Sequence, residues 1–219
     1  ESFRGYNRFM SSPRAPMAWL ALMLIAIIGV VLLFRTPPAP PIRIGVLHSL
    51  SGTMAESERP LVDAVRLAVE EINAAGGLLG RPVEMVVADG RSDNTVFARE
   101  AERLIASDKV SALFACWTSA CRKAVKPVVE KHQHLMFYPL QYEGLEQSPD
   151  IVFTGVAPNQ QIIPMALWAL QNKGNRFFLI GSDYLFPRTA NLILRDVLSA
   201  HEGQLLGERY LPLGASDMA

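Results

Sequence analysis

The segment Ile42-Arg-Ile-Gly-Val-Leu-His48 begins a pattern of alternating elements that indicates the fold class and runs to residue 87. It is a short apolar run that ends in a loop containing serine and glycine, which is typical of a buried strand. Residues 61–75 then repeat apolar side chains at helical spacing, and Gly76 and Gly77 supply a C-terminal cap. Residues 83–87 form a second apolar run. The order strand, helix, strand predicts a βαβ unit with parallel strands.

The same alternation continues along the rest of the chain. A helix capped by Asp93 or Asn94 is predicted to run to Ile105, and a second is predicted to start at Thr118 or Ser119. The remaining predicted elements are strands over 110–115, 135–138, 151–153, 176–180 and 204–210, and helices over 158–172 and 190–199. This pattern predicts an α/β fold with parallel sheets flanked by helices on both faces.

Composition excludes several classes of protein. The chain has 21 Lys and Arg against 21 Asp and Glu, a formal net charge of zero. A nucleic-acid binder needs surplus positive charge, so that class is disfavoured. Half of the residues are hydrophobic and 19% are charged, which excludes a disordered chain. Two cysteines are too few for a disulfide scaffold or a four-cysteine zinc site.

One apolar segment predicts a membrane anchor. No charged residue occurs from Ala15 to Phe34, and a helix of that length spans a hydrocarbon core of about 30 Å. A cleaved signal peptide is the competing interpretation, but no small-x-small cleavage site precedes the Pro-rich stretch after Arg35. Arg4, Arg8 and Arg14 precede the segment, which predicts a cytoplasmic N-terminus and an extracytoplasmic remainder.

These patterns divide the chain into four parts. We predict a cytoplasmic segment over 1–14, a transmembrane helix over 15–35, a Pro-rich linker over 36–41 and an α/β region over 42–219.

The loops that follow the predicted strands are the candidate site, because ligands of parallel sheets bind outside the carboxyl ends of strands. Thr118 and Ser119 begin a helix there, where they either hold a carbonyl oxygen or small anion, or simply cap the helix. Tyr138, Tyr142 and Tyr184 either offer hydroxyls and ring faces to a small planar ligand, or are partly buried at a sheet edge. No cationic residue occurs at these strand ends.

The remaining chemically active residues favour structural interpretations. Cys116 and Cys121 are expected to be two buried thiols rather than a disulfide, and His132 and His134 to be surface residues rather than metal ligands. No Walker A, Gly-x-Ser-x-Gly or dinucleotide fingerprint is present. We therefore expect neither an enzyme nor a cofactor.

Several long motifs resemble a known family, the urea and short-chain-amide substrate-binding proteins. These are type I periplasmic binding proteins of urea ABC transporters, related to the amide sensor of the aliphatic amidase operon. The motifs that carry the resemblance are residues 44–55, 70–80, 116–119, 122–125, 137–139, 141–144, 157–161 and 181–184.

The resemblance implies a Venus flytrap of two α/β lobes with ligand in the cleft between them. By this resemblance, residues 42–157 form a first, periplasmic ligand-binding lobe, and residues 158–219 begin a second lobe that we expect to be incomplete. Ser119, Tyr138 and Tyr184 resemble the residues of the family that contact the amide. The same cleft would be lined by Trp117, Gln141 and Tyr142. A urea-like ligand is neutral and planar, and it needs hydroxyls, backbone groups and an aromatic lid in a desolvated cleft.

Two functions follow from the resemblance. The first is a transport component, located in the periplasm or outside the cell, that delivers urea or a short amide to an ABC permease. The second is the sensor region of a membrane receptor, joined through the transmembrane helix to a fused cytoplasmic signalling domain such as a kinase. The sequence leaves both open.

Overall fold

The computed structural model describes residues 19–20, 23–27 and 39–215. The chain divides into two units, Glu1–Ala39 and Pro40–Ala219. The predicted cytoplasmic segment over 1–14 lies outside the described residues, as do most of the predicted transmembrane helix over 15–35 and the first half of the predicted linker over 36–41. Within the described part of the chain, no helix is both long and apolar enough to cross a membrane.

The second unit opens with a five-stranded parallel sheet. Its strand order is β2-β1-β3-β4-β5, and every pairing in it is parallel, as the βαβ pattern predicts. The strands are β1 (Ile42–His48), β2 (Val83–Asp89), β3 (Leu113–Ala115), β4 (Met136–Tyr138) and β5 (Ile151–Phe153). Parallel pairing brings the carboxyl ends of these strands to one edge of the sheet, where the loops of interest lie.

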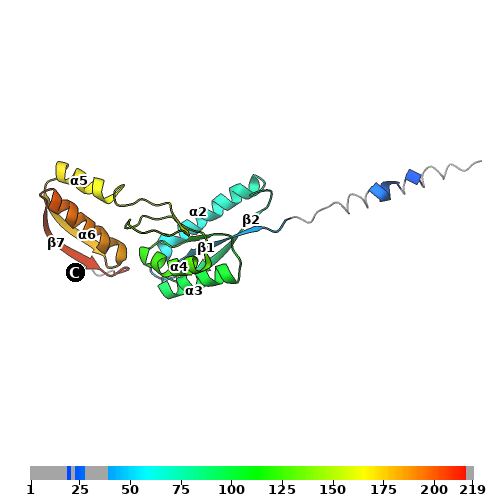
Figure 1. Cartoon of the computed structure of the whole chain (residues 1–219), viewed down its shortest axis with the longest axis horizontal. Coiled ribbons are helices and arrows are strands. Elements are labelled where there is room, and N and C mark those ends of the chain that lie inside the picture. The colour runs from blue at the N-terminus through cyan, green and yellow to red at the C-terminus, as the bar shows by residue number, and fades with distance from the viewer. Residues whose placement is uncertain (1–18, 21–22, 28–38, 216–219) are drawn as a thin grey trace, which may run out of the picture. The chain divides into compact units, whose positions relative to one another are not determined.

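Helices cover both faces of this sheet (Figure 1). On one face, α3 (Asn94–Ala106) and α4 (Ser119–His132) enclose a continuous apolar core. On the other face, α2 (Ala55–Ala74) packs against strand residues such as Ile42 and Ile44, where an apolar cavity of about 460 Å³ remains. The main core residues, all with no exposed surface, are Leu47, Leu104, Leu113, Val125, Val129 and Met136.

A second, smaller sheet follows along the chain. It contains β6 (Arg176–Ser182) and β7 (Gln204–Leu211), which pair in parallel with an irregularity between Phe177 and Phe178. The helices α5 (Ile162–Asn172) and α6 (Leu185–Ala200) contact each other, and α6 packs against both strands.

Element boundaries differ from the sequence predictions mainly at helix starts. The apolar repeat of α2 begins at Leu61, whereas the helix begins at Ala55, where Glu56 and Glu58 favour the positive end of the helix dipole. α5 begins at Ile162 rather than Pro158, and α6 begins at Leu185 rather than Ala190. β3 begins three residues later than predicted, at Leu113.

The predicted caps agree better with the structure. Asp93 accepts hydrogen bonds from the backbone N–H groups of Thr95 and Val96, and so starts α3. After α2, the chain reverses through Gly77 at a φ of 82°, and a Cβ there would lie 2.1 Å from the Arg81 carbonyl oxygen. Only glycine fits that turn.

Candidate functional site

The loop after β1 is held by carboxylate and hydroxyl groups. Asp89, at the end of β2, accepts hydrogen bonds from the Leu50 N–H at 2.8 Å and from the Ser51 hydroxyl at 2.7 Å. Burial would raise the pKa of Asp89, but these bonds and that from the Arg91 N–H outweigh it and lower the pKa below its ordinary value. The ionised carboxylate therefore fixes the loop.

A buried pair lies beneath this loop. His48 and Glu58 are each about 1% exposed, and His48 Nδ1 lies 3.2 Å from Glu58 Oε2. The same oxygen accepts a hydrogen bond from the Ser49 N–H at 2.7 Å. Glu58 comes from the first turns of α2, so this carboxylate ties the helix to the end of β1.

The turn from β3 into α4 is closed by a disulfide. Cys116 adopts a φ of 69° and is bonded to Cys121, with the two Cα atoms 5.6 Å apart. The prediction of two free thiols was wrong. The first turn of α4 curls back over the end of β3 and brings the two Cα atoms within the range that a disulfide spans. Thr118 caps α4 by accepting a hydrogen bond from the Cys121 N–H at 3.1 Å.

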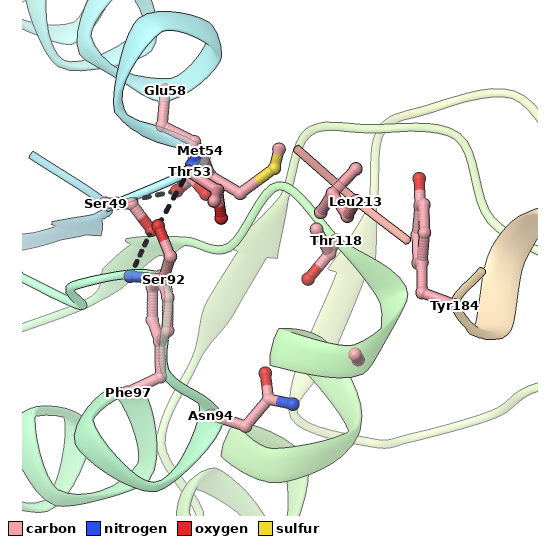
Figure 2. A pocket seen from close by; sticks show the side chains of 11 residues that line it. Ser49, Thr53, Met54, Glu58, Ser92, Asn94, Phe97, Thr118, Tyr184 and Leu213 are labelled. Atoms are coloured by element: carbon pink, nitrogen blue, oxygen red, sulfur yellow. Dashed lines mark hydrogen bonds between the residues drawn. The ribbon is translucent and has the colours of Figure 1, made fainter. Parts of the chain in front are cut away.

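A cavity of about 160 Å³ opens beside these loops. Figure 2 shows Ser49, Thr53 and Ser92 on one side of it and Tyr184 on the other. Ser92 connects the loops, because its N–H donates to Ser49 Oγ at 3.0 Å. Most of the other lining is polar or small, and no Lys or Arg contributes to it; the remaining lining residues are Met54, Glu58, Asn94, Phe97, Thr118, Ala120 and Leu213.

Ser119 lies next to this cavity but turns toward a buried cluster. We call the group of Arg122, Ser119, Glu143 and Glu146 the Arg122 cluster. Arg122 has no exposed surface, and its Nη1 donates to Ser119 Oγ at 3.0 Å. Its Nη2 donates to Glu143 Oε2 at 2.7 Å and to Glu146 Oε2 at 2.8 Å. Burial would lower the pKa of Arg122, but its bonds to the two carboxylates outweigh burial and raise it.

Tyr138 lies under the Arg122 guanidinium. The ring centroid is 4.6 Å from Arg122 Cζ, and the side chain has no exposed surface. The hydroxyl has the backbone oxygens of Trp117 at 3.0 Å and of Gln141 at 3.3 Å as acceptors. Burial raises the pKa of Tyr138, although the charge of Arg122 opposes the rise. Tyr138 therefore joins the β3 and β4 loops.

The other predicted site residues occupy more open positions. Tyr142 is half-buried and stacks on Phe153, with ring centroids 4.4 Å apart. Trp117 and Gln141 are also half-buried, and their backbone oxygens accept from Tyr138. Tyr184 is half-buried at the start of α6, and among the six predicted residues it is the one that lines the 160 Å³ cavity.

The sequence prediction missed the cation of this region. The strand ends carry no Lys or Arg, yet Arg122 lies one helical turn beyond Ser119 and reaches back to it. The spacing i, i+3 on a helix places both side chains on one face, and this was the available signal. Glu143 and Glu146 had no such signal, because they come 21 and 24 residues after Arg122.

The histidines at the C-terminal end of α4 and just after it contact protein groups. His132 Nε2 lies 2.8 Å from Glu102 Oε1, and His134 Nε2 lies 2.8 Å from the Val110 carbonyl oxygen. Among the described residues, no group of three or more His, Cys, Asp or Glu side chains is placed to hold a metal ion.

Comparison with known proteins gives the family. The profile of the periplasmic binding protein domain matches residues 42–219. A Leu/Ile/Val-binding protein homologue from Brucella abortus is 33% identical over 94 residues, which make up 43% of this chain and 23% of that protein. A second homologue of this type from the same organism is 36% identical over 89 residues, 41% of this chain and 22% of that protein.

Solved structures have the same fold. A solute-binding protein of an ABC transporter from Rhodopseudomonas palustris, in complex with 3,4-dihydroxybenzoic acid, matches with a TM-score of 0.74 and 21% identity over 82% of this chain. A branched-chain amino acid substrate-binding protein from Streptococcus pneumoniae, in complex with isoleucine, matches with a TM-score of 0.73 and 22% identity over 81% of this chain. The match covers 49% and 51% of those two chains, so this chain spans about half their length. On the match over residues 42–219, this chain belongs to the periplasmic binding protein domain family.

Proposed function

We propose that this chain is part of an extracytoplasmic solute-binding protein that captures urea or a short-chain amide for ABC-type uptake. The observation that carries the proposal is the cavity of about 160 Å³ at the carboxyl ends of the strands, lined by hydroxyl groups, an amide and Tyr184 without a basic side chain. Drug-sized ligands occupy pockets of about 300–1,000 Å³, so this volume suits a molecule of a few heavy atoms.

Of the six proposed ligand-binding residues, Tyr184 lines this cavity, and Ser119 lies between two residues that line it, Thr118 and Ala120. Ser119, Tyr138 and Tyr184 contact the amide, and Trp117, Gln141 and Tyr142 line the cleft. Ser119 Oγ already accepts a hydrogen bond from Arg122, so its own proton is available for a ligand oxygen. The buried phenol of Tyr138 holds the loops on which these groups lie.

The names of the relatives favour a second ligand class. The Brucella relatives are Leu/Ile/Val-binding protein homologues, and a leucine-binding protein from Thermotoga maritima shares the fold. Calorimetry on the intact gene product, with urea, acetamide and leucine as separate titrants, tests the choice. We expect heat from urea or acetamide and none from leucine. Binding of leucine alone would refute the amide proposal and leave the solute-binding fold intact.

We also propose that residues 15–35 anchor the protein in the membrane, with the binding region outside the cytoplasm. The disulfide between Cys116 and Cys121 supports an oxidising compartment. The protein should stay in the membrane fraction after an alkaline wash. Recovery of a mature N-terminus between residues 35 and 42 would instead show a cleaved signal peptide.

The proposed membrane anchor is also compatible with the alternative function, that of a sensor. An uncleaved helix preceded by Arg4, Arg8 and Arg14 also suits a receptor that passes the binding signal to a cytoplasmic domain. The reading frame around this segment separates the two roles. A fused kinase or cyclase would support the receptor, and neighbouring permease and ATPase genes would support uptake.

A further inference from the structure

Two carboxylate oxygens of the Arg122 cluster, Glu143 Oε1 and Glu146 Oε1, have no hydrogen-bond partner among the described residues. Lys126 Nζ lies 3.8 Å from Glu146 Oε1 and compensates its charge, so Glu143 Oε1 is the oxygen of interest. The side chain of Glu143 is 9% exposed, and its Oε2 accepts the hydrogen bond from Arg122 Nη2. Its other oxygen, Oε1, is buried and has no hydrogen-bond partner within residues 39–215. Buried polar atoms of native proteins are nearly always paired, so an unpaired charged oxygen calls for a partner.

Glu143 lies where the β3–α4 corner and the start of α6 come together. A single guanidinium, that of Arg122, donates both to Glu143 and to Ser119 Oγ. Glu143 also lines a cavity of about 350 Å³ together with Leu185 and Thr189 of α6. Leu185 directly follows Tyr184, so this cavity places Glu143 beside the first turn of α6.

The charges around Glu143 determine which donor suits it. Arg122 already neutralises the carboxylate through a bond of 2.7 Å. Lys123 Nζ lies 2.9 Å from Glu146 Oε2, on the other carboxylate of the Arg122 cluster. A further full positive charge is therefore not needed at Oε1, and a neutral N–H donor is sufficient.

We propose that Glu143 Oε1 accepts a hydrogen bond from the N–H of the ligand, while Ser119 donates its proton to the carbonyl oxygen of the ligand. The two residues then bind opposite ends of a primary amide or of urea, and Glu143 determines the specificity for a ligand that carries an N–H donor. This inference rests on the proposed function. A merely structural role for Glu143, in which it only holds Arg122, is the competing explanation.

The variant Glu143→Gln distinguishes the two explanations. The amide oxygen of the new side chain must face the donors of Arg122, so its NH₂ group takes the place of Oε1 and turns an acceptor into a donor. Acetamide and acetate have the same shape and differ in whether that end of the ligand donates or accepts. The variant should bind acetamide about ten- to a hundredfold more weakly, while its preference for acetate over acetamide rises.

The matched control is Glu146→Gln, which neutralises the other carboxylate that accepts hydrogen bonds from Arg122. We expect it to leave the ratio of acetate to acetamide affinity unchanged, as measured by calorimetry on the intact gene product. Equal weakening of both ligands in Glu143→Gln, or the same ratio in both variants, would overturn the inference and leave the amide function standing.

Two further results keep the test decisive. If Glu143→Gln does not fold, the affinities of the unmodified protein for acetamide and acetate are compared instead. The unmodified protein should bind acetamide at least about tenfold more tightly than acetate. The opposite preference would overturn the inference. If the unmodified protein binds neither acetamide nor urea, the proposed function fails and this inference fails with it.

Discussion

The two sheets use similar strand sequences but are covered to very different degrees. In β1, the four residues from Gly45 to His48 are buried. In β6, which reads Arg-Phe-Phe-Leu-Ile-Gly-Ser, Leu179 is the one buried residue. Phe178 and Ile180 are 52% and 69% exposed. Parallel strands are normally covered on both faces, so exposed side chains of this kind mark a face that lacks its covering layer.

Charged groups differ in the same way. Arg122 is fully buried between two carboxylates beside the first sheet, whereas the side chain of Arg195 on α6 is 48% exposed and pairs with Glu208. An apolar run in the sequence therefore predicts a strand, but not how deeply the strand or its ion pairs are buried. The stability of the described unit should depend mainly on the first sheet.

The largest expected effect comes from removing the buried cation. Arg122→Met leaves Glu143 buried without its counter-ion and leaves Glu146 paired with Lys123, and the unpaired carboxylate should cost about 3–5 kcal/mol of the free energy of unfolding. The matched change Arg195→Met removes an exposed pair and should cost less than about 1 kcal/mol. Guanidinium chloride unfolding measures both, and equal losses would contradict the contrast between the two regions.

A leucine in each region provides the next comparison. Leu104 on α3 has no exposed surface, and Leu104→Ala should cost about 2–5 kcal/mol through lost burial and a new cavity. Leu192 on α6 is 54% exposed, and Leu192→Ala should change stability by less than about 0.5 kcal/mol. A large loss in Leu192→Ala would show that α6 is covered in the intact protein.

The disulfide should contribute less than either of these core groups. Replacing Cys116 and Cys121 together by Ser should lower the free energy of unfolding by about 2 kcal/mol, because the loop that the bond closes is short. A reducing agent should destabilise the original protein and leave the double variant unchanged. Two reactive thiols in denatured, unreduced protein would show that the bond is absent.

The smallest effect concerns acid stability. Burial would raise the pKa of Glu146, but its hydrogen bonds to Arg122 and Lys123 outweigh burial and lower it. Ionised Glu146 therefore adds to the free energy of unfolding above its ordinary pKa of 4.5, and this stabilisation is lost as the pH falls below that value. Glu146→Gln should flatten the acid limb of a stability–pH curve. Asp183→Asn should do so less, because that carboxylate is exposed and screened. An acid limb that Glu146→Gln leaves unchanged would contradict this assignment.

The sequence predicted the parallel sheet and most strands because apolar runs and helix caps are local patterns. Asp93 and Thr118, for example, cap their helices as the local sequence indicates. The disulfide was missed because it depends on how tightly the corner between β3 and α4 turns. The contacts of Arg122 with Glu143 and Glu146 were missed because the chain must first fold to bring residues more than twenty positions apart together.

The proposed site for a small amide lies at the carboxyl ends of the first sheet. A crystal structure of the intact gene product with acetamide would show whether the ligand binds there. We predict the amide oxygen about 3 Å from Ser119 Oγ, the amide nitrogen at a similar distance from Glu143 Oε1, and the Tyr184 ring against the ligand. Acetamide bound away from these residues, or an amino acid retained in their place, would contradict the account.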